Sequence, residues 1–169
     1  MIRIGLIGLL SVFLAACSPD YNWRQVSVGD GVATAFFPDK PRTQERTLPF
    51  SGHDIVFSLT SATVDDALFT VAHAPLPEAL RANQAARREF ATAVVRSLYR
   101  NLGVQEPEPL PAFGELFVIE GQGPQGPVRL QARVWLTDRS LVEGLVTAAR
   151  DAFPAAQADE FLQGLSVAQ

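Results

Sequence analysis

The clearest signal along the chain is an alternation of apolar and polar positions in short segments. A strand with one buried face has this period of two, because successive side chains point to opposite faces of a sheet. The strongest example, in 128–137, places five apolar side chains on one face: Val128, Leu130, Ala132, Val134 and Leu136. Similar patterns predict strands over 32–37, 115–120 and 141–147, and a hairpin over 54–73 that turns at Asp65-Asp66.

A helical period replaces the strand period between this hairpin and the last three strands. From Leu80 to Leu102 the apolar residues fall on one arc of a helix, namely Phe90, Ala91, Val94, Val95, Leu98 and Leu102. Gly103 is suited to the C-terminal cap of this helix. Arg87 lies inside the apolar arc, so either its stem lies along the edge of the arc or the helical phase shifts there. A short second helix is predicted from Pro154 to about Gln163.

The order of these elements predicts the fold class. Neighbouring strands are joined by tight turns, and a strand group, a helix, a second strand group and a second helix follow one another. We therefore expect an α+β domain with a mostly antiparallel sheet of about six strands, on which one long and one short helix pack. The segment 42–47 is polar throughout and carries no strand pattern.

The first 16 residues have the pattern of an export signal. Arg3 supplies a positive charge, and 13 uncharged residues follow from Ile4 to Ala16. A membrane-spanning helix needs roughly 20 apolar residues, so this run is too short to cross a bilayer. The only cysteine of the chain, Cys17, comes directly after it.

The four residues LAAC at 14–17 resemble a bacterial lipobox. The resemblance implies that the Cys17 thiol carries diacylglycerol, that residues 1–16 are removed, and that the new amine is acylated. A free thiol after an ordinary cleavage site and an uncleaved hydrophobic anchor are the alternatives. Residues 17–25 then form the lipidated cysteine and a tether, with Trp23 as the first side chain to contact the domain, and 26–169 form a single α+β domain.

A lipidated Cys17 also predicts location. One acyl chain binds a membrane marginally, whereas additional chains make attachment stable. In lipoprotein sorting of the Gram-negative type, an Asp directly after the cysteine favours retention in the inner membrane. This chain has Ser18 there, with Asp20 two residues further on. We therefore expect a lipid-anchored envelope protein at the outer membrane, facing the periplasm.

Charge and cysteine content restrict the partners. The chain has 14 basic and 18 acidic residues, and only one of these charged residues, Arg3, lies in the signal. An acidic exported domain is a poor match for nucleic acid, whose binding requires many phosphate contacts by Lys and Arg. With its single cysteine committed to lipid, the domain has no disulfide to stabilise it.

Two short phrases and the order of elements resemble a known superfamily. FFPDKP at 36–41, a hairpin before one long helix, a three-stranded return and FLQGLSV at 161–167 are similar to the PsbP/DcrB-like α/β/α sandwich. That superfamily includes small exported bacterial lipoproteins. The resemblance implies an antiparallel sheet with helices against its faces and an assembly, binding or accessory role, and it implies no catalytic residues.

Motifs that could carry chemistry have simpler explanations. The segment 121–126 matches GxGxxG, but a strand follows it where a dinucleotide site needs a helix, so a hairpin loop is expected. Asp65-Asp66 lacks the further oxygen ligands of a calcium loop. His53 and His73 are the only histidines, and no GxSxG or HExxH motif accompanies them. We expect no catalytic residues, no metal site and no cofactor.

Two surfaces are candidate interaction sites. Four arginines lie on the face of the long helix away from the apolar arc: Arg81, Arg88, Arg96 and Arg100. This face suits anionic headgroups or an acidic partner, and it also fits an ordinary solvated helix. The second surface is the polar face of 128–137, with Arg129, Arg133 and Trp135. Arg beside Trp is favoured at interfaces, although the same side chains also suit packing at a sheet edge.

These patterns favour a non-enzymatic envelope lipoprotein. We expect a periplasm-facing binding, assembly or accessory module that attaches to the membrane through Cys17 and acts on an unidentified envelope protein. The alternative is a lipid-binding or small-molecule-binding protein with a pocket between the sheet and the long helix.

Overall fold

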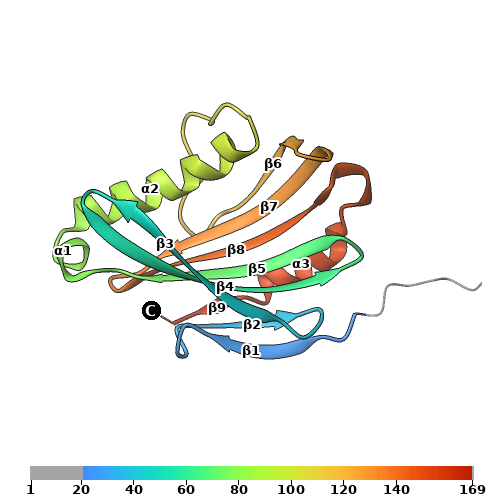
Figure 1. Ribbon diagram of the computed structural model, residues 1–169, viewed down its shortest axis with the longest axis horizontal. Coiled ribbons are helices and arrows are strands. Elements are labelled where there is room, and N and C mark those ends of the chain that lie inside the picture. The colour runs from blue at the N-terminus through green and yellow to red at the C-terminus, as the bar shows by residue number, and fades with distance from the viewer. Residues whose placement is uncertain (1–20, 169) are drawn as a thin grey trace, which may run out of the picture.

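Two antiparallel sheets form the framework of the computed structural model, which describes residues 21–168 (Figure 1). The six-stranded sheet has the order β3-β4-β5-β8-β7-β6, with bounds Arg42–Phe50, His53–Val64, Ala67–Pro75, Ser140–Ala149, Gly126–Leu136 and Leu116–Gly123. The three-stranded sheet has the order β1-β2-β9, with bounds Arg24–Val28, Ala33–Phe37 and Ser166–Val167.

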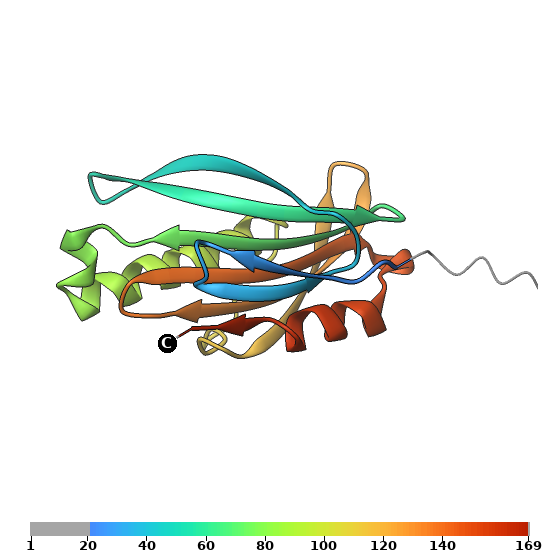
Figure 2. The same cartoon turned by 90° about the horizontal axis from the view of Figure 1, so that it is seen from below.

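Helices complete a three-layer arrangement. The α-helices are α1 (Glu78–Arg81), α2 (Gln84–Asn101) and α3 (Ala155–Gln163), and a 3-10 turn spans Arg150–Ala152. Helix α2 covers one face of the six-stranded sheet. The smaller sheet and α3 cover the other face, as the view from below shows (Figure 2). The six-stranded sheet is therefore buried on both faces at its centre.

The core beneath α2 follows from the sequence pattern. Phe90, Ala91 and Val95 pack from the helix onto one face of the sheet, where Leu130, Ala132 and Val134 of β7 are buried. The Gly103 cap is confirmed, since the Val104 N–H bonds to the Tyr99 carbonyl at 3.0 Å and Gly103 has a φ of 67°. The expected strands over 32–37, 54–73, 115–120, 128–137 and 141–147 and the α3 helix are confirmed in position.

Three phenylalanines join the elements on the opposite face. Phe161 of α3 lies 5.3 Å from Phe37 of the small sheet and 5.5 Å from Phe69 of β5, measured between ring centroids. Both pairs have edge-on geometry, which aromatic rings prefer. Ala33, Ala35 and Phe37 are buried, as the alternation in 32–37 predicts. This cluster holds α3 and both sheets together.

The expectation of a single long helix over 80–102 was wrong at its N-terminal end. The chain leaves the helix at Ala82-Asn83 and starts again, because the Asn83 side chain accepts a hydrogen bond from the Ala86 N–H at 3.1 Å. An N-cap of this kind satisfies a donor that a new helix would otherwise leave free. The described part of the chain therefore contains three α-helices rather than one long and one short helix.

The expectation of a single sheet of about six strands was also incomplete. Strand β3 forms in the polar segment 42–50 because it pairs with β4 along its whole length, although its residues up to Pro49 are all exposed. Strand β1 starts inside the segment 17–25 that was expected to be a tether. Trp23 contacts the core as expected, and Tyr21 stacks on it at 5.8 Å.

Candidate functional site

A cleft of about 570 Å³ opens at the end of the six-stranded sheet where β7 turns into β8. Its walls come from the first turn of α2, the loop before β6, the end of β7, the β7–β8 turn and β9: Gln84, Arg87, Arg88, Phe113, Gly114, Trp135, Leu136, Thr137, Asp138 and Val167. Two side chains from different predicted surfaces, Arg88 and Trp135, lie in this one cleft.

Arg87 connects α2 to the β7–β8 turn at the cleft. Its Nη2 donates to Asp138 Oδ1 at 2.9 Å, and its Nη1 donates to the Arg81 carbonyl oxygen. Only 13% of the Arg87 side chain is exposed. The side chain therefore lies at the edge of the apolar arc with its charged group bonded, which decides between the two explanations that the sequence left open.

Trp135 lines the cleft, and Arg133 lies beside it on the same strand, β7. The Arg133 Nε donates to the Gly114 carbonyl oxygen at 2.6 Å, and its guanidinium carbon lies 5.1 Å from the centroid of the Trp135 ring. A guanidinium over an indole face is held by the ring quadrupole as well as by contact. The hydrogen bond and the stack fix the Arg133 side chain and leave Trp135 half-buried at the opening.

The four arginines of the predicted basic face do not form one continuous patch, and Arg81 lies in α1 whereas the other three lie in α2. Arg81 is paired with Glu78 and Arg96 with Glu106, each at 3.0 Å. Arg88 and Arg100 make no ion pair within residues 21–168. These two lie twelve positions apart, about 18 Å along the helix. Arg88 is therefore the cation of this face that is free to act in the cleft.

Arg129 lies away from the cleft, at the other end of β7. It contacts Glu120 at 3.5 Å and stacks on the Phe153 ring at 5.1 Å. Trp135 lies six positions further along β7, which corresponds to about 20 Å along a strand. Its neighbour Gln131 bonds to Asp159 of α3 at 2.6 Å. Arg129 therefore belongs to the packing of α3 rather than to the site.

Two buried titratable side chains lie near the middle of the sheet. Burial raises the pKa of Glu143 in β8 from 4.5 to about 7. Burial also lowers the pKa of His73 in β5, an effect that nearby Asp30 partly offsets. His73 pairs with Val142, so it lies on the small-sheet face, whereas Glu143 lies between Ala72 and Val134 on the α2 face. The two groups cannot form an acid–base pair across the sheet.

The β1–β2 turn closes over His73. A Cβ atom on Gly29 would lie 2.5 Å from His73 Nδ1, and Gly29 has a φ of 62°, so the turn requires glycine for space and for conformation. The His73 Nε2 is buried and has no hydrogen-bond partner among residues 21–168. His53 begins β4, five residues from the partner of His73, or about 16 Å along the strand. The two histidines therefore do not meet.

The GxGxxG segment and Asp65-Asp66 form turns, as the sequence predicts. The GxGxxG segment forms the β6–β7 hairpin, where Gly123 pairs with Gly126, and Asp65 and Asp66 form the β4–β5 turn with positive φ angles. A group of three or more potential metal-ligating side chains is not found within residues 21–168. Helices of the described part are too short or too polar to span a membrane.

A second, smaller pocket lies between β3 and α2. It measures about 140 Å³ and is mainly apolar, with Leu48, Phe50, Phe90 and Val94 among its lining residues. It lies where the sequence-based alternative places a pocket between sheet and helix. Sites for small molecules usually measure about 300–1,000 Å³, so this hollow is smaller than a typical ligand pocket.

The sequence did not single out Glu143 as a buried acidic residue, and it left the position of the Arg87 side chain open. For Glu143, the available signal was an acidic residue within an otherwise apolar predicted strand.

The predicted lipid attachment site, Cys17, lies outside the described residues. Comparisons of the chain with protein-family models, curated proteins and solved structures found no significant match.

Proposed function

We propose that the protein is a lipid-anchored binding module of the cell envelope, and that the cleft holding Arg88 and Trp135 is its binding site. The single observation that supports this is the combination, in one cleft, of an arginine that forms no ion pair with the described residues and an aromatic ring fixed by a second arginine. Trp and Arg are the side chains that most often dominate binding energy at protein interfaces.

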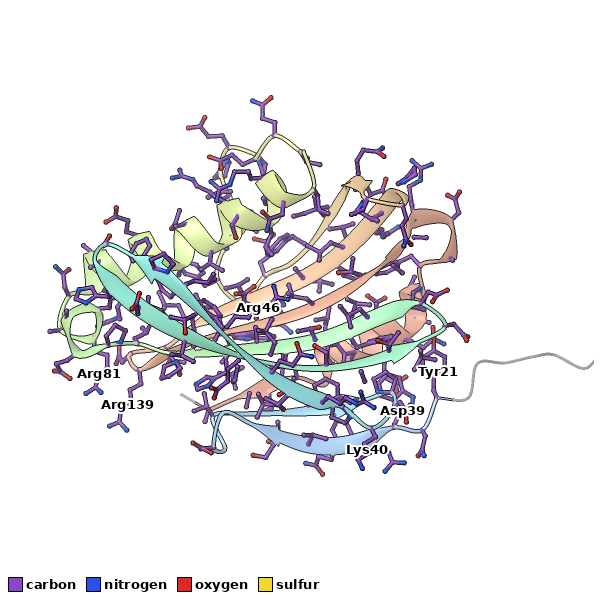
Figure 3. All side chains as sticks on the ribbon, viewed as in Figure 1. Tyr21, Asp39, Lys40, Arg46, Arg81 and Arg139 are labelled. Carbon is purple, nitrogen blue, oxygen red and sulfur yellow. The ribbon has the colours of Figure 1, made fainter. Side chains whose placement is uncertain are left out.

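The position of the cleft supports a partner that approaches from the periplasm. Tyr21, where the described chain begins, lies at one end of the domain, and Arg81 and Arg139 lie at the opposite end (Figure 3). Arg81 accepts a hydrogen bond from Arg87, and Arg139 follows Asp138, so the cleft lies at that opposite end. A chain anchored through Cys17 would present the cleft away from its own membrane.

The chemistry of the cleft favours binding over catalysis. Among the lining residues Asp138 alone is acidic, and it is bonded to Arg87. Histidine, cysteine and lysine are not among the lining residues. General acid–base chemistry needs a group that titrates near the working pH and reaches the substrate, and arginine is not such a group.

The cleft can be tested by photo-crosslinking in cells. With benzoylphenylalanine at Gln84 in the full-length protein, we expect an adduct with an envelope partner, and Arg88→Glu should reduce its yield about tenfold or more, because a charge-assisted contact becomes repulsive. Arg100→Glu makes the same change of charge at the other end of α2 and should leave the yield unchanged. Equal loss with both variants, or labelling as strong from Gln25 of β1, would contradict the proposal.

The anchor has a separate test. Cys17→Ser should move the protein out of the membrane fraction or leave it with an uncleaved signal, because the acyl chains that hold it can no longer be attached. Ser18→Ala keeps the thiol and should retain membrane attachment. Fractionation and intact mass measurement of both variants check the prediction. A Cys17→Ser protein that remains in the membrane fraction at the mature mass of the parent would show that Cys17 is not lipidated.

A further inference from the structure

The outer edge of β6 is open over its first half. Strand β6 ends the order of the six-stranded sheet. The Gln122 N–H points away from β7, since it bonds to the Leu102 carbonyl at 3.0 Å. Alternate residues of a strand point their N–H groups the same way, so those of Leu116, Val118 and Glu120 also point outward. These three make no backbone hydrogen bond to another residue of 21–168 on that side.

Two exposed apolar side chains lie along this open edge, at positions that a strand added beside β6 would cover. Leu116 is 39% exposed and Val118 is 42% exposed. Both lie on the face of the sheet that carries Arg133, because Leu116 pairs directly with Arg133 in β7. A strand added beside β6 could bond to the free main-chain groups and bury both apolar side chains at once.

The opposite edge of the sheet, strand β3, is protected from pairing with another strand. Phe50 pairs with His53 across a two-residue turn, so the outward positions of β3 are Thr43, Glu45, Thr47 and Pro49. Pro49 has no N–H to offer, and the other three side chains are polar. Proline and charge are common protections of an exposed edge strand. The two edges therefore differ: the residues with outward N–H groups include two apolar side chains in β6, whereas in β3 they are polar or proline.

The open edge continues into the cleft. Gly114 lines the cleft two residues before β6 begins, and its carbonyl oxygen accepts the hydrogen bond from Arg133. A chain leaving the edge at Leu116 therefore reaches the cleft next to the Arg133–Trp135 stack. Arg88 is the cation there without a partner, so the complementary group is a carboxylate.

We infer that β6 accepts an extended segment of a partner protein as an additional strand of the larger sheet. The segment has apolar side chains at alternate positions, which lie against Leu116 and Val118, and an Asp or Glu that enters the cleft and binds Arg88. This inference rests on the proposed binding function of the cleft and names the class of its partner, an acidic peptide segment.

The test uses the full-length protein in its membrane, with benzoylphenylalanine at Leu116 and the adduct peptide identified by mass spectrometry. Val118→Pro removes an outward N–H without breaking the β6–β7 ladder, and Thr47→Pro removes an outward N–H at the opposite edge, in β3. We expect Val118→Pro to lower the adduct yield about tenfold, because a main-chain hydrogen bond is lost and the proline ring crowds the edge, and Thr47→Pro to leave it nearly unchanged. The crosslinked peptide should contain Asp or Glu.

The outcomes separate this inference from the proposed function. A Gln84 adduct that Val118→Pro leaves unchanged would keep the cleft as a binding site and overturn the added strand. Absence of any Gln84 adduct would overturn the proposed function itself. A Leu116 adduct with lipid, with a second copy of this chain, or with a peptide lacking acidic residues would overturn the inference about the partner. If thermal unfolding shows that Val118→Pro is not folded, Val118→Lys replaces it, since an edge lysine opposes strand pairing.

Discussion

Replacing Phe161 with alanine should lower the free energy of unfolding by about 4 kcal/mol. The side chain is fully buried, and its ring contacts Phe37 of the small sheet and Phe69 of the large sheet. Removing it costs the transfer free energy of a phenyl ring and leaves a cavity between three elements that cannot all close on it. Denaturant unfolding followed by tryptophan fluorescence would measure the loss, since Trp23 and Trp135 both pack against this cluster.

Phe36 provides the matched control for Phe161. It has the same side chain, but it lies on the outer face of β2 and is 42% exposed. Phe36→Ala should cost about 1 kcal/mol or less, as substitutions at exposed positions usually do. If the two variants lose similar free energy, the Phe37–Phe69–Phe161 cluster is not what joins the two sheets.

The sequence predicted those elements in which burial of one face produces a periodic pattern of apolar residues. Strand β7 and helix α2 were identified because each has one buried face, and Ala33, Ala35 and Phe37 were expected on one side of a strand for the same reason. Caps were predictable where one residue type is required, as at Gly103. A helix cap of this kind depends on only a few neighbouring residues, so the sequence alone can predict it.

The sequence could not predict features that depend on distant pairing. Strand β3 has no buried face, so its strand conformation comes from β4 and leaves no pattern in 42–50. Strand β9 has two residues and exists because β2 lies beside it. The candidate site was predicted in part: Arg88 and Trp135 were both identified, but their meeting in one cleft follows from the turn after β7 and the capped start of α2.

The sequence pattern likewise could not predict which arginines pair with acidic residues. Four arginines on one helix face suggested a basic surface, yet Glu78 and Glu106, which lie outside α2, neutralise two of them. Exposed ion pairs of this kind contribute little to stability, typically below about 1 kcal/mol. Their consequence is for recognition, because they leave Arg88 as the free cation near Trp135.

Raising the pH from 5 to 8 should destabilise the parent protein relative to Glu143→Gln by about 2.5 kcal/mol. Burial beneath α2 raises the pKa of Glu143 to about 7, whereas in the unfolded chain the carboxyl ionises near its ordinary value of 4.5. Between these two values the folded state holds a proton that the unfolded state has released. The free energy of unfolding therefore falls as pH rises, by about 1.4 kcal/mol per pH unit, until the folded carboxyl also ionises near pH 7.

Glu143→Gln removes this titration while keeping the shape of the side chain, so the difference between the two proteins isolates one group from all others that titrate. At pH 4 and below the two proteins should have nearly equal stability, because the Glu143 carboxyl is then largely protonated in the unfolded chain as well as in the folded protein. Glu120→Gln, the same substitution at a half-exposed residue of β6, serves as the control for loss of a carboxyl group outside the core. A stability difference between parent and Glu143→Gln that stays constant from pH 5 to 8 would show that Glu143 is ionised in the folded protein, and that water or a counter-charge reaches it beneath α2.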